Sequence, residues 1–281
     1  MICVSGASGR LGSILRATWA RADVVWSRRL AGEGWLAWDM MTEPFPASGT
    51  DLRGGVMLCL AGVVPAPGAV LASNIQIALA ACEAAQSVGA RHVFLASSGA
   101  VYGPGGLKSV PFAETALPHP TSEYGAAKLT AEREVALWQA CHPGICVTHL
   151  RIGNVAGADA VLGRPLDVLR RIDPVPGSAG GPLRSYIGPQ GFARVLSGLC
   201  DLALSGGNIP PILNIAAPGA VAMGDLLTAA GADWETGPAN AAVIPAVVLA
   251  TGQLERLLPG AAGSGSVDDL VADWRIWRER A

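Results

Sequence analysis

Lysine is nearly absent from this chain of 281 residues, because only Lys108 and Lys128 occur and the other eighteen of its twenty basic residues are arginines. Charge of either sign is scarce, at 15% of residues against a usual ~25%, while 51% of residues are apolar. A disordered polyelectrolyte is therefore excluded. No block of basic residues that could follow a phosphate backbone occurs, so nucleic acid is not an expected partner. Codon bias is the simplest interpretation of the general shortage of lysine, but the shortage makes the position of each lysine informative.

Metal-ligand spacing is absent too. The four histidines show no such pattern and no two cysteines have C-x-x-C spacing, so we predict no metal site. Several cysteines lie within apolar runs, and we interpret the set as reduced core residues. The six are Cys3, Cys59, Cys82, Cys141, Cys146 and Cys200.

The chain also lacks a long uncharged apolar run. Its richest stretch, residues 241–250, is too short for a membrane helix and contains Pro245. Met1 is followed directly by Ile2 and a glycine turn, which leaves no room for a signal peptide. We expect a soluble cytoplasmic protein with no membrane contact.

The first half of the chain alternates short apolar or β-branched runs with longer alanine-rich segments. This alternation predicts an α/β fold of the Rossmann type, a doubly wound parallel sheet with helices on both faces. The predicted strands are residues 2–5, 24–27, 56–60, 92–96 and 145–150, and the predicted helices are residues 12–19, 70–88 and 122–140.

Glycine and proline become frequent after Val155. We therefore predict a dinucleotide-binding domain over residues 1–155 and a smaller, mainly substrate-binding region over residues 156–281. A helix at 190–204 and a strand at 212–215 are expected to return to the first domain. Further helices are predicted at 223–231, 246–257 and 267–279.

A glycine-rich turn lies between the first predicted strand and the first predicted helix. Such a turn lets a pyrophosphate approach the backbone at a helix N-terminus, where free N–H groups and the helix dipole favour an anion. The sequence thus predicts a dinucleotide site that includes Gly6, Ser8, Gly9, Arg10, Leu11 and Gly12.

The end of the second predicted strand favours NADP over NAD. NAD is usually held there by an acidic side chain on its ribose 2′-hydroxyl, but this strand ends in Arg28 and Arg29. Together with Arg10 they could bind a 2′-phosphate, since guanidinium groups are permanently charged, planar donors. Solvated surface arginines are the alternative.

Tyr124 and Lys128 are four residues apart on a predicted helix, which places the phenol and the ammonium on one face. A free tyrosine has a pKa near ~10, and nearby positive charge favours its phenolate, which makes it usable as an acid or base. Ser98 follows a predicted strand at the carboxyl edge of the sheet, where ligands bind in open α/β folds.

These motifs resemble those of the extended short-chain dehydrogenase/reductase family, the NAD(P)-dependent epimerases, dehydratases and reductases. The resemblance covers nearly the whole chain. It is carried by G-A-S-G-R-L-G at 6–12, L-A-G at 60–62, S-S-G-A-V-Y-G at 97–103, Y-G-A-A-K at 124–128 with Glu132 following, R-I-G-N-V at 151–155 and R-S-Y-I at 184–187.

The resemblance implies roles for individual residues. Ser98, Tyr124 and Lys128 would form the catalytic triad, with Asn74 supporting the site. Tyr124 and Lys128 would also contact the cofactor, together with Asp39 near the adenine, Leu60, Ala61, Gly62, Ile152 and Gly153. The substrate would lie against Ser98, Gly99, Asn154 and Arg184, and family members often hold a substrate phosphate with this arginine. The His and Asp that usually follow its segment are missing here.

The shared chemistry of the family is hydride transfer at a carbon that bears a hydroxyl or carbonyl group. A reductase or a sugar epimerase fits best, with a nucleotide sugar among the candidate substrates. A dehydratase is disfavoured, because Gly99 and Ala100 stand where that branch carries an Asp-Glu pair. A non-catalytic NAD(P)H-binding redox sensor remains the alternative. The helices at 70–88 and 122–140 could also pair two copies into a homodimer.

Overall fold

The structure is a computed structural model that describes residues 1–46 and 51–280. Its strands are β1 Ile2–Ser5, β2 Val24–Arg28, β3 Leu36–Ala37, β4 Val56–Cys59, β5 His92–Ser98, β6 Cys146–Ile152, β7 Asn154–Val155, β8 Arg170–Ile172, β9 Leu183–Arg184, β10 Tyr186–Ile187, β11 Ile212–Ile215, β12 Val221–Ala222, β13 Trp234–Thr236 and β14 Ala246–Val247. Its helices are α1 Arg10–Thr18, α2 Ser73–Ser87, α3 Glu123–Ala140, α4 Pro189–Leu204, α5 Met223–Ala230, α6 Gly252–Leu257 and α7 Val267–Arg278, with a 3-10 turn at Gly99–Tyr102.

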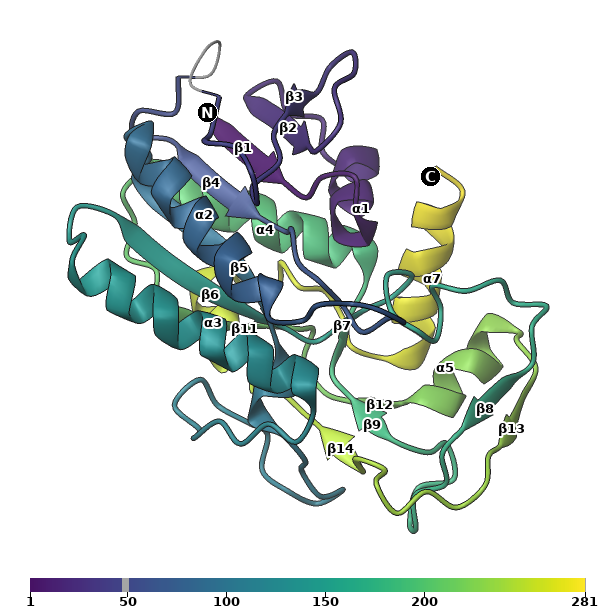
Figure 1. The fold of residues 1–281 in the computed structure, drawn as a ribbon. Helices are drawn as coiled ribbons and strands as arrows, with labels where there is room; N and C mark the ends of the chain where they lie inside the picture. The colour runs from purple at the N-terminus through teal and green to yellow at the C-terminus, as the bar shows by residue number, and fades with distance from the viewer. Residues whose placement is uncertain (47–50, 281) are drawn as a thin grey trace. The chain divides into compact units, whose positions relative to one another are not determined.

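The central sheet has seven strands in the order β11-β6-β5-β4-β1-β2-β3. Strand β1 pairs in parallel with both β2 and β4, and the chain order reverses between β1 and β4. Helices α2 and α3 lie together over one face of this sheet (Figure 1). The predicted Rossmann-type parallel sheet is therefore confirmed, and the point where the strand order reverses is where such folds bind ligands.

The chain divides into two compact units whose segments interleave along the sequence. Unit 1 consists of Met1–Ser98, Ser122–Arg151 and Leu196–Leu213, and unit 2 consists of Gly99–Thr121, Ile152–Val195 and Asn214–Ala281. Part of α4 and the first half of β11 belong to unit 1, although they come late in the sequence. The proposal that residues 1–155 bind the cofactor and later residues bind the substrate stays a prediction.

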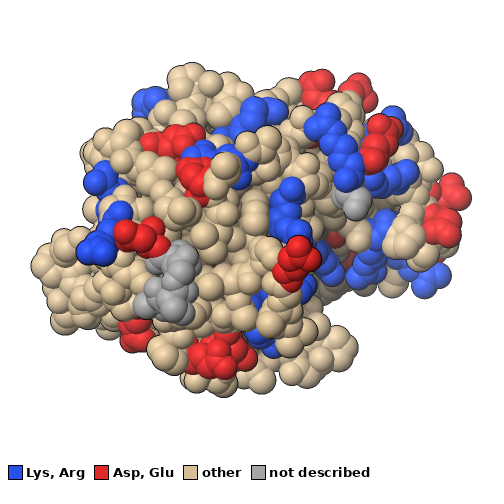
Figure 2. All heavy atoms as spheres, turned by 90° about the horizontal axis from the view of Figure 1, so that it is seen from above, with Lys and Arg blue, Asp and Glu red and all other residues tan. Residues whose placement is uncertain are grey.

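Charged side chains of both signs are interspersed on the face shown in Figure 2. Within unit 1, Arg21 links two segments that are distant in sequence: one guanidinium nitrogen lies 2.8 Å from Asp23 and another 2.7 Å from Asp201 on α4.

Among residues 1–46 and 51–280, no helix has the length and apolar character to cross a membrane, and no three metal-ligating side chains are grouped.

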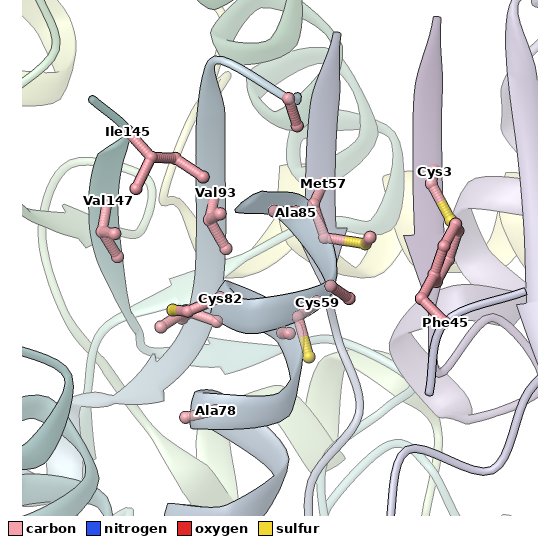
Figure 3. Close-up of a cluster of buried hydrophobic side chains, with 14 of the residues drawn as sticks. Cys3, Phe45, Met57, Cys59, Ala78, Cys82, Ala85, Val93, Ile145 and Val147 are labelled. Atoms are coloured by element: carbon pink, nitrogen blue, oxygen red, sulfur yellow. The ribbon is translucent and has the colours of Figure 1, made fainter. Parts of the chain in front are cut away.

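The core of unit 1 is formed where α2 packs on the sheet. Met57 and Cys59 on β4, Val93 on β5 and Cys82 on α2 belong to one cluster of buried side chains (Figure 3). Alternate residues of a strand point to one face, and small residues on α2 such as Ala85 allow its backbone to approach the sheet. Strands β1 and β4 are buried along their whole length, which their continuous apolar sequences predict.

Two sequence-based expectations are wrong. Residues 246–257 do not form one helix, because Ala246–Val247 is a strand that pairs with β9, and the helix begins only at Gly252. The β-branched Val247 and Val248 favour extended backbone, and the Ala246 amide bonds the Gly105 carbonyl. The cysteines are not all core residues either. Four are buried, whereas Cys141 and Cys146 are exposed near the α3–β6 connection.

Candidate functional site

The glycine turn after β1 is tightly packed on its inner side and open on its outer side. Gly6 has φ +72°, and a Cβ there would lie 2.4 Å from the backbone nitrogen of Ala61, which follows β4. Gly12 is buried in α1, and a Cβ on it would lie 2.4 Å from the Cα of Ala7. Only glycine fits these two positions, so the turn needs them for its shape.

The N-terminus of α1 lies in this turn. Its N-cap residue, Gly9, has no side chain that could cap the helix, and the first turn of the helix contains no acidic residue. Gly9 and its neighbours Ser8 and Arg10 are exposed. Backbone N–H groups at such an end carry partial positive charge, so this arrangement fits the pyrophosphate of a dinucleotide.

Ser98, Tyr124 and Lys128 meet at the end of β5. A hydrogen bond joins the side chains of Ser98 and Tyr124. The Lys128 Nζ lies 5.9 Å from the centroid of the Tyr124 ring, one helical turn further along α3. Ser122 caps this helix by accepting a hydrogen bond from the Gly125 amide, which fixes where the helix begins just before Tyr124.

Burial sets the protonation of both groups in the protein alone. It raises the pKa of Tyr124, and the hydrogen bond from Ser98 opposes this rise. It lowers the pKa of Lys128 from 10.5 to about 8, against the attraction of Cys59 and Glu132. Lys128 is 7% exposed and donates a 2.9 Å hydrogen bond to the Ala96 carbonyl.

Asn74 lies in the first turn of α2 and holds the loop after β4. Its amide donates to the carbonyls of Val63 and Leu71, and its Oδ1 accepts from the Val63 amide at 3.1 Å. A Cβ on Gly62 would lie 3.0 Å from both the Asn74 Oδ1 and the Lys128 Nζ, so the two side chains converge on that glycine. Asn74 therefore shapes the loop that faces Lys128.

A buried ion pair lies one turn beyond Lys128. Two nitrogens of Arg151 on β6 contact the two carboxylate oxygens of Glu132, at 3.1 Å and 2.7 Å, and the Ser97 hydroxyl donates to the same carboxylate. Our sequence analysis gave this pair no role. The signal available was the repeat of four from Tyr124 through Lys128 to Glu132, which places all three on one helix face.

The arginines predicted to bind the 2′-phosphate of NADP do not all point into solvent. Arg28 donates to the carbonyls of Leu30 and Ala31, and its guanidinium lies 4.5 Å from the centroid of the Trp35 ring. Arg29 is exposed. Asp39 accepts a hydrogen bond from the Met41 amide and shapes the turn after β3.

In unit 2, Asn154 belongs to a partly buried hydrogen-bond network with Tyr186 and Asp159. The Tyr186 hydroxyl donates to Asp159 at 2.8 Å and also bonds the Asn154 side chain. Because the single phenolic proton goes to Asp159, the Asn154 amide must donate to Tyr186. Asp159 is half-buried, and loss of hydration raises the pKa of its carboxyl group. Sequence analysis missed both Asp159 and the role of Tyr186.

Arg184, also in unit 2, has no acidic partner among the residues that the structure describes. Its guanidinium donates to the Leu183 carbonyl at 2.7 Å and to the Ile244 carbonyl at 3.0 Å. Burial lowers its pKa, although an arginine remains charged at neutral pH. Gly153 approaches the Ser185 carbonyl so closely that a Cβ would lie 2.7 Å from it.

The parallel sheet and the glycine turn after its first strand are those of the Rossmann class of α/β proteins. A family model described as the NAD dependent epimerase/dehydratase family matches residues 61–172. That range includes Asn74, Ser98, Tyr124 and Lys128 but neither the glycine turn nor Arg184. The resemblance to extended short-chain dehydrogenase/reductases is therefore confirmed.

Solved structures share this fold across almost the whole chain. A UDP-glucose 4-epimerase from Stenotrophomonas maltophila, with NAD bound, is 20% identical with a TM-score of 0.78, covering 99% of this chain and 98% of that one. A dTDP-glucose 4,6-dehydratase from Streptomyces venezuelae, also with NAD, is 20% identical with a TM-score of 0.75, covering 99% and 97%. No curated protein matches the sequence. Because epimerases and dehydratases share the fold, it does not distinguish between their reactions.

Proposed function

We propose that the protein is an NAD(P)-dependent oxidoreductase that moves a hydride to or from a carbon bearing a hydroxyl or carbonyl group. The observation that carries this proposal is the hydrogen bond between Ser98 and Tyr124, with the Lys128 ammonium one helical turn away. The exposed N-terminus of α1 supports coenzyme binding beside the same sheet edge. When bound, the nicotinamide coenzyme supplies or accepts the hydride.

The side chains of unit 1 would handle the proton. Tyr124 holds its proton in the protein alone, because burial raises its pKa, so it can give that proton to a carbonyl oxygen during reduction. Ser98 would donate a hydrogen bond to the same oxygen. The positive charge of Lys128 would stabilise the resulting phenolate and hold a coenzyme ribose hydroxyl. Oxidation of an alcohol would follow the same steps in reverse.

Epimerisation and net reduction both use these groups. In epimerisation the keto intermediate would turn over before the hydride returns, whereas a reductase releases the oxidised coenzyme after one transfer. Gly99 and Ala100 carry no carboxylic acid to assist elimination of water. We therefore propose an epimerase or reductase rather than a dehydratase.

We infer that NADP is preferred and that Arg29 and Arg10 bind its 2′-phosphate. Arg28 would fold the loop around Trp35 instead, since its guanidinium already bonds two loop carbonyls. The expected result is tighter binding of NADPH than of NADH in a fluorescence titration. Arg29→Ala should remove most of this difference and leave NADH binding within about twofold. Equal affinity of the native protein for the two coenzymes would contradict the inference.

A nucleotide sugar is the candidate substrate that Arg184 favours. The half-buried Arg184 guanidinium bonds carbonyls of Leu183 and Ile244 and keeps an unbalanced positive charge, which a phosphate would balance. Solved structures of this fold contain UDP-glucose and UDP-glucuronic acid. Asn154 would face the sugar.

The decisive test is Tyr124→Phe. UDP-glucose, dTDP-glucose and uncharged ketones would be incubated with NADPH or NADH, with absorbance detecting net reduction and chromatography detecting epimerisation. The variant should lose about 10²–10⁴-fold in kcat, the usual contribution of a general acid–base group. Tyr102→Phe is the matched control, because it removes another buried, hydrogen-bonded tyrosine hydroxyl.

Two outcomes would count against the proposal. Undiminished turnover by Tyr124→Phe would refute the assigned acid–base role. Tight coenzyme binding with no turnover of any substrate in the screen would favour a redox sensor.

We also propose that two copies pair through α2 and α3. Leu137 on α3 is 67% exposed, and the pairing of two copies through this helix would bury its side chain. A dimer in sedimentation at micromolar concentration is expected, and Leu137→Glu should convert it to a monomer. A monomeric native protein would exclude this arrangement.

A further inference from the structure

Helix α3 and strand β5 are joined by three polar contacts. Tyr124 bonds Ser98, Lys128 donates to the Ala96 carbonyl, and Glu132 accepts from the Ser97 hydroxyl. Three successive turns of the helix thus contact three consecutive residues of the strand. A shift of the helix along the strand would break all three contacts together.

The third contact is the one most firmly anchored. Glu132 is 6% exposed and Arg151 is 2% exposed, and their two-pronged ion pair adds β6 to the same assembly. Removing one partner of such a pair leaves a buried charge without compensation, which makes the arrangement costly to break. The Glu132 carboxylate is therefore a fixed charge rather than a mobile one.

A small cavity of about 20 Å³ connects this carboxylate with Lys128. Its lining includes Asn74, Lys128, Glu132, Cys59, Ser97 and His149. Burial raises the pKa of the Cys59 thiol and lowers that of His149 to about 4, so both are neutral at neutral pH. Of the described residues that line the cavity, only Glu132 is acidic.

We propose that Glu132, held in place by Arg151 and Ser97, is a positioning residue for the catalytic site: its carboxylate keeps the Lys128 ammonium charged and seated on the Ala96 carbonyl. This inference rests on the proposed function only in that it takes Lys128 to be a catalytic residue. Five residues with titratable or charged side chains lie around the Lys128 ammonium or form the neighbouring ion pair of Glu132 with Arg151. They are Tyr124 and Glu132 on α3, Cys59 on β4, and His149 and Arg151 on β6.

The scarcity of lysine makes a direct test possible. Lys108 and Lys128 are the only lysines, so protein grown with lysine carrying carbon-13 at Cε gives two NMR signals, and Lys108→Arg leaves one. Lys108 is exposed and has no part in the proposed site. The pH midpoint of the remaining signal reports the protonation of Lys128 without any substrate or turnover.

Glu132→Gln should lower this midpoint by about one pH unit, because it removes the nearby negative charge and leaves Arg151 unbalanced. If the protein also turns over a substrate, the alkaline fall in its kcat profile should move to lower pH by a similar amount. Glu134→Gln is the matched control. It makes the same change on the exposed side of the same helix and should leave the midpoint unchanged.

An unchanged Lys128 midpoint in folded Glu132→Gln would overturn the proposal and leave the ion pair a purely structural one. If Glu132→Gln does not fold, Glu132→Asp carries the test, since it retains the charge but withdraws it by one methylene. Glu132→Asp should lower the Lys128 midpoint by less than Glu132→Gln would. An unchanged midpoint in this variant would also overturn the proposal. Because the titration needs no catalysis, failure to find a substrate would not affect this result.

Discussion

The ammonium of Lys128 is buried and its pKa is lowered from 10.5 to about 8, chiefly by loss of hydration. In the unfolded chain the same lysine holds its proton up to its ordinary pKa. The unfolded state therefore binds more protons between about pH 8 and pH 10.5, and stability rises with pH across that window. Below pH 8 the full cost of burying the charge is present.

Lys128→Met should therefore stabilise the protein while abolishing its activity. We expect a gain of about 2 kcal/mol in the free energy of unfolding at pH 7, after allowing ~1 kcal/mol for the Ala96 carbonyl that loses its donor. Urea unfolding at pH 7 and at pH 10 measures this, because the gain should shrink at the higher pH. A variant that is less stable than the native protein at pH 7 would show that Lys128 is a net structural support.

At the scale of elements, α1 and the turn before it depend on close backbone approach. Gly12→Ala would place a Cβ 2.4 Å from the Cα of Ala7, and neither backbone can move without opening the turn. We expect a loss of at least about 2 kcal/mol in unfolding free energy, together with weaker NADH binding. Gly9→Ala is the contrasting variant, since its Cβ would lie 3.2 Å from the Gly6 carbonyl oxygen. Its stability loss should be under half as large, and equal losses would contradict this account.

The order of elements in unit 1 could be predicted because each strand carries its own apolar pattern and each helix its own length. Strands β1 and β11 have the predicted bounds. Helix α2 begins at Ser73, three residues later than predicted, because residues 70–72 form a turn whose carbonyls accept the first amides of the helix. Local pattern is sufficient where burial is uniform along an element.

Pairings between distant segments could not be predicted. The two-residue strands β9, β12 and β14 are too short to be recognised from their own sequences, and each pairs with a segment of unit 2 that is distant along the chain. The same holds for the site. Tyr124 and Lys128 are visible as a local motif, whereas the ion pair of Glu132 with Arg151 joins residues nineteen positions apart. The pairing of buried charged residues depends on the order of the strands in the sheet, which the local sequence around each residue does not encode.

For the molecule as a whole, two buried histidines make stability depend on acid. Loss of hydration lowers the pKa of His92 and of His149 from 6.5 to about 4 in the folded state. Between pH 6.5 and about pH 4, these two histidines are protonated in the unfolded chain but not in the folded chain. Stability therefore falls as pH falls from about 6.5 to about 4 and is unaffected by these groups above pH 7.

His92 allows this to be tested with its hydrogen bond preserved. Thr148 donates its hydroxyl proton to the Pro210 carbonyl, so the His92 Nε2, 3.0 Å from that hydroxyl, must be the donor in its bond. His92→Gln places an amide donor in a similar position but cannot take up a proton. Between pH 7 and pH 4.5 the native protein should lose about 2 kcal/mol more unfolding free energy than this variant.

Urea unfolding at the two pH values, with linear extrapolation to water, measures the difference. At pH 7 the variant should be somewhat less stable than the native protein, because it loses the stacking of His92 on Phe94, whose ring centroids lie 4.3 Å apart. His119→Gln removes an exposed histidine and should reproduce the acid sensitivity of the native protein. If His92→Gln loses as much stability in acid as the native protein does, the acid sensitivity of the fold lies elsewhere, and the buried carboxylates rather than the histidines would have to account for it.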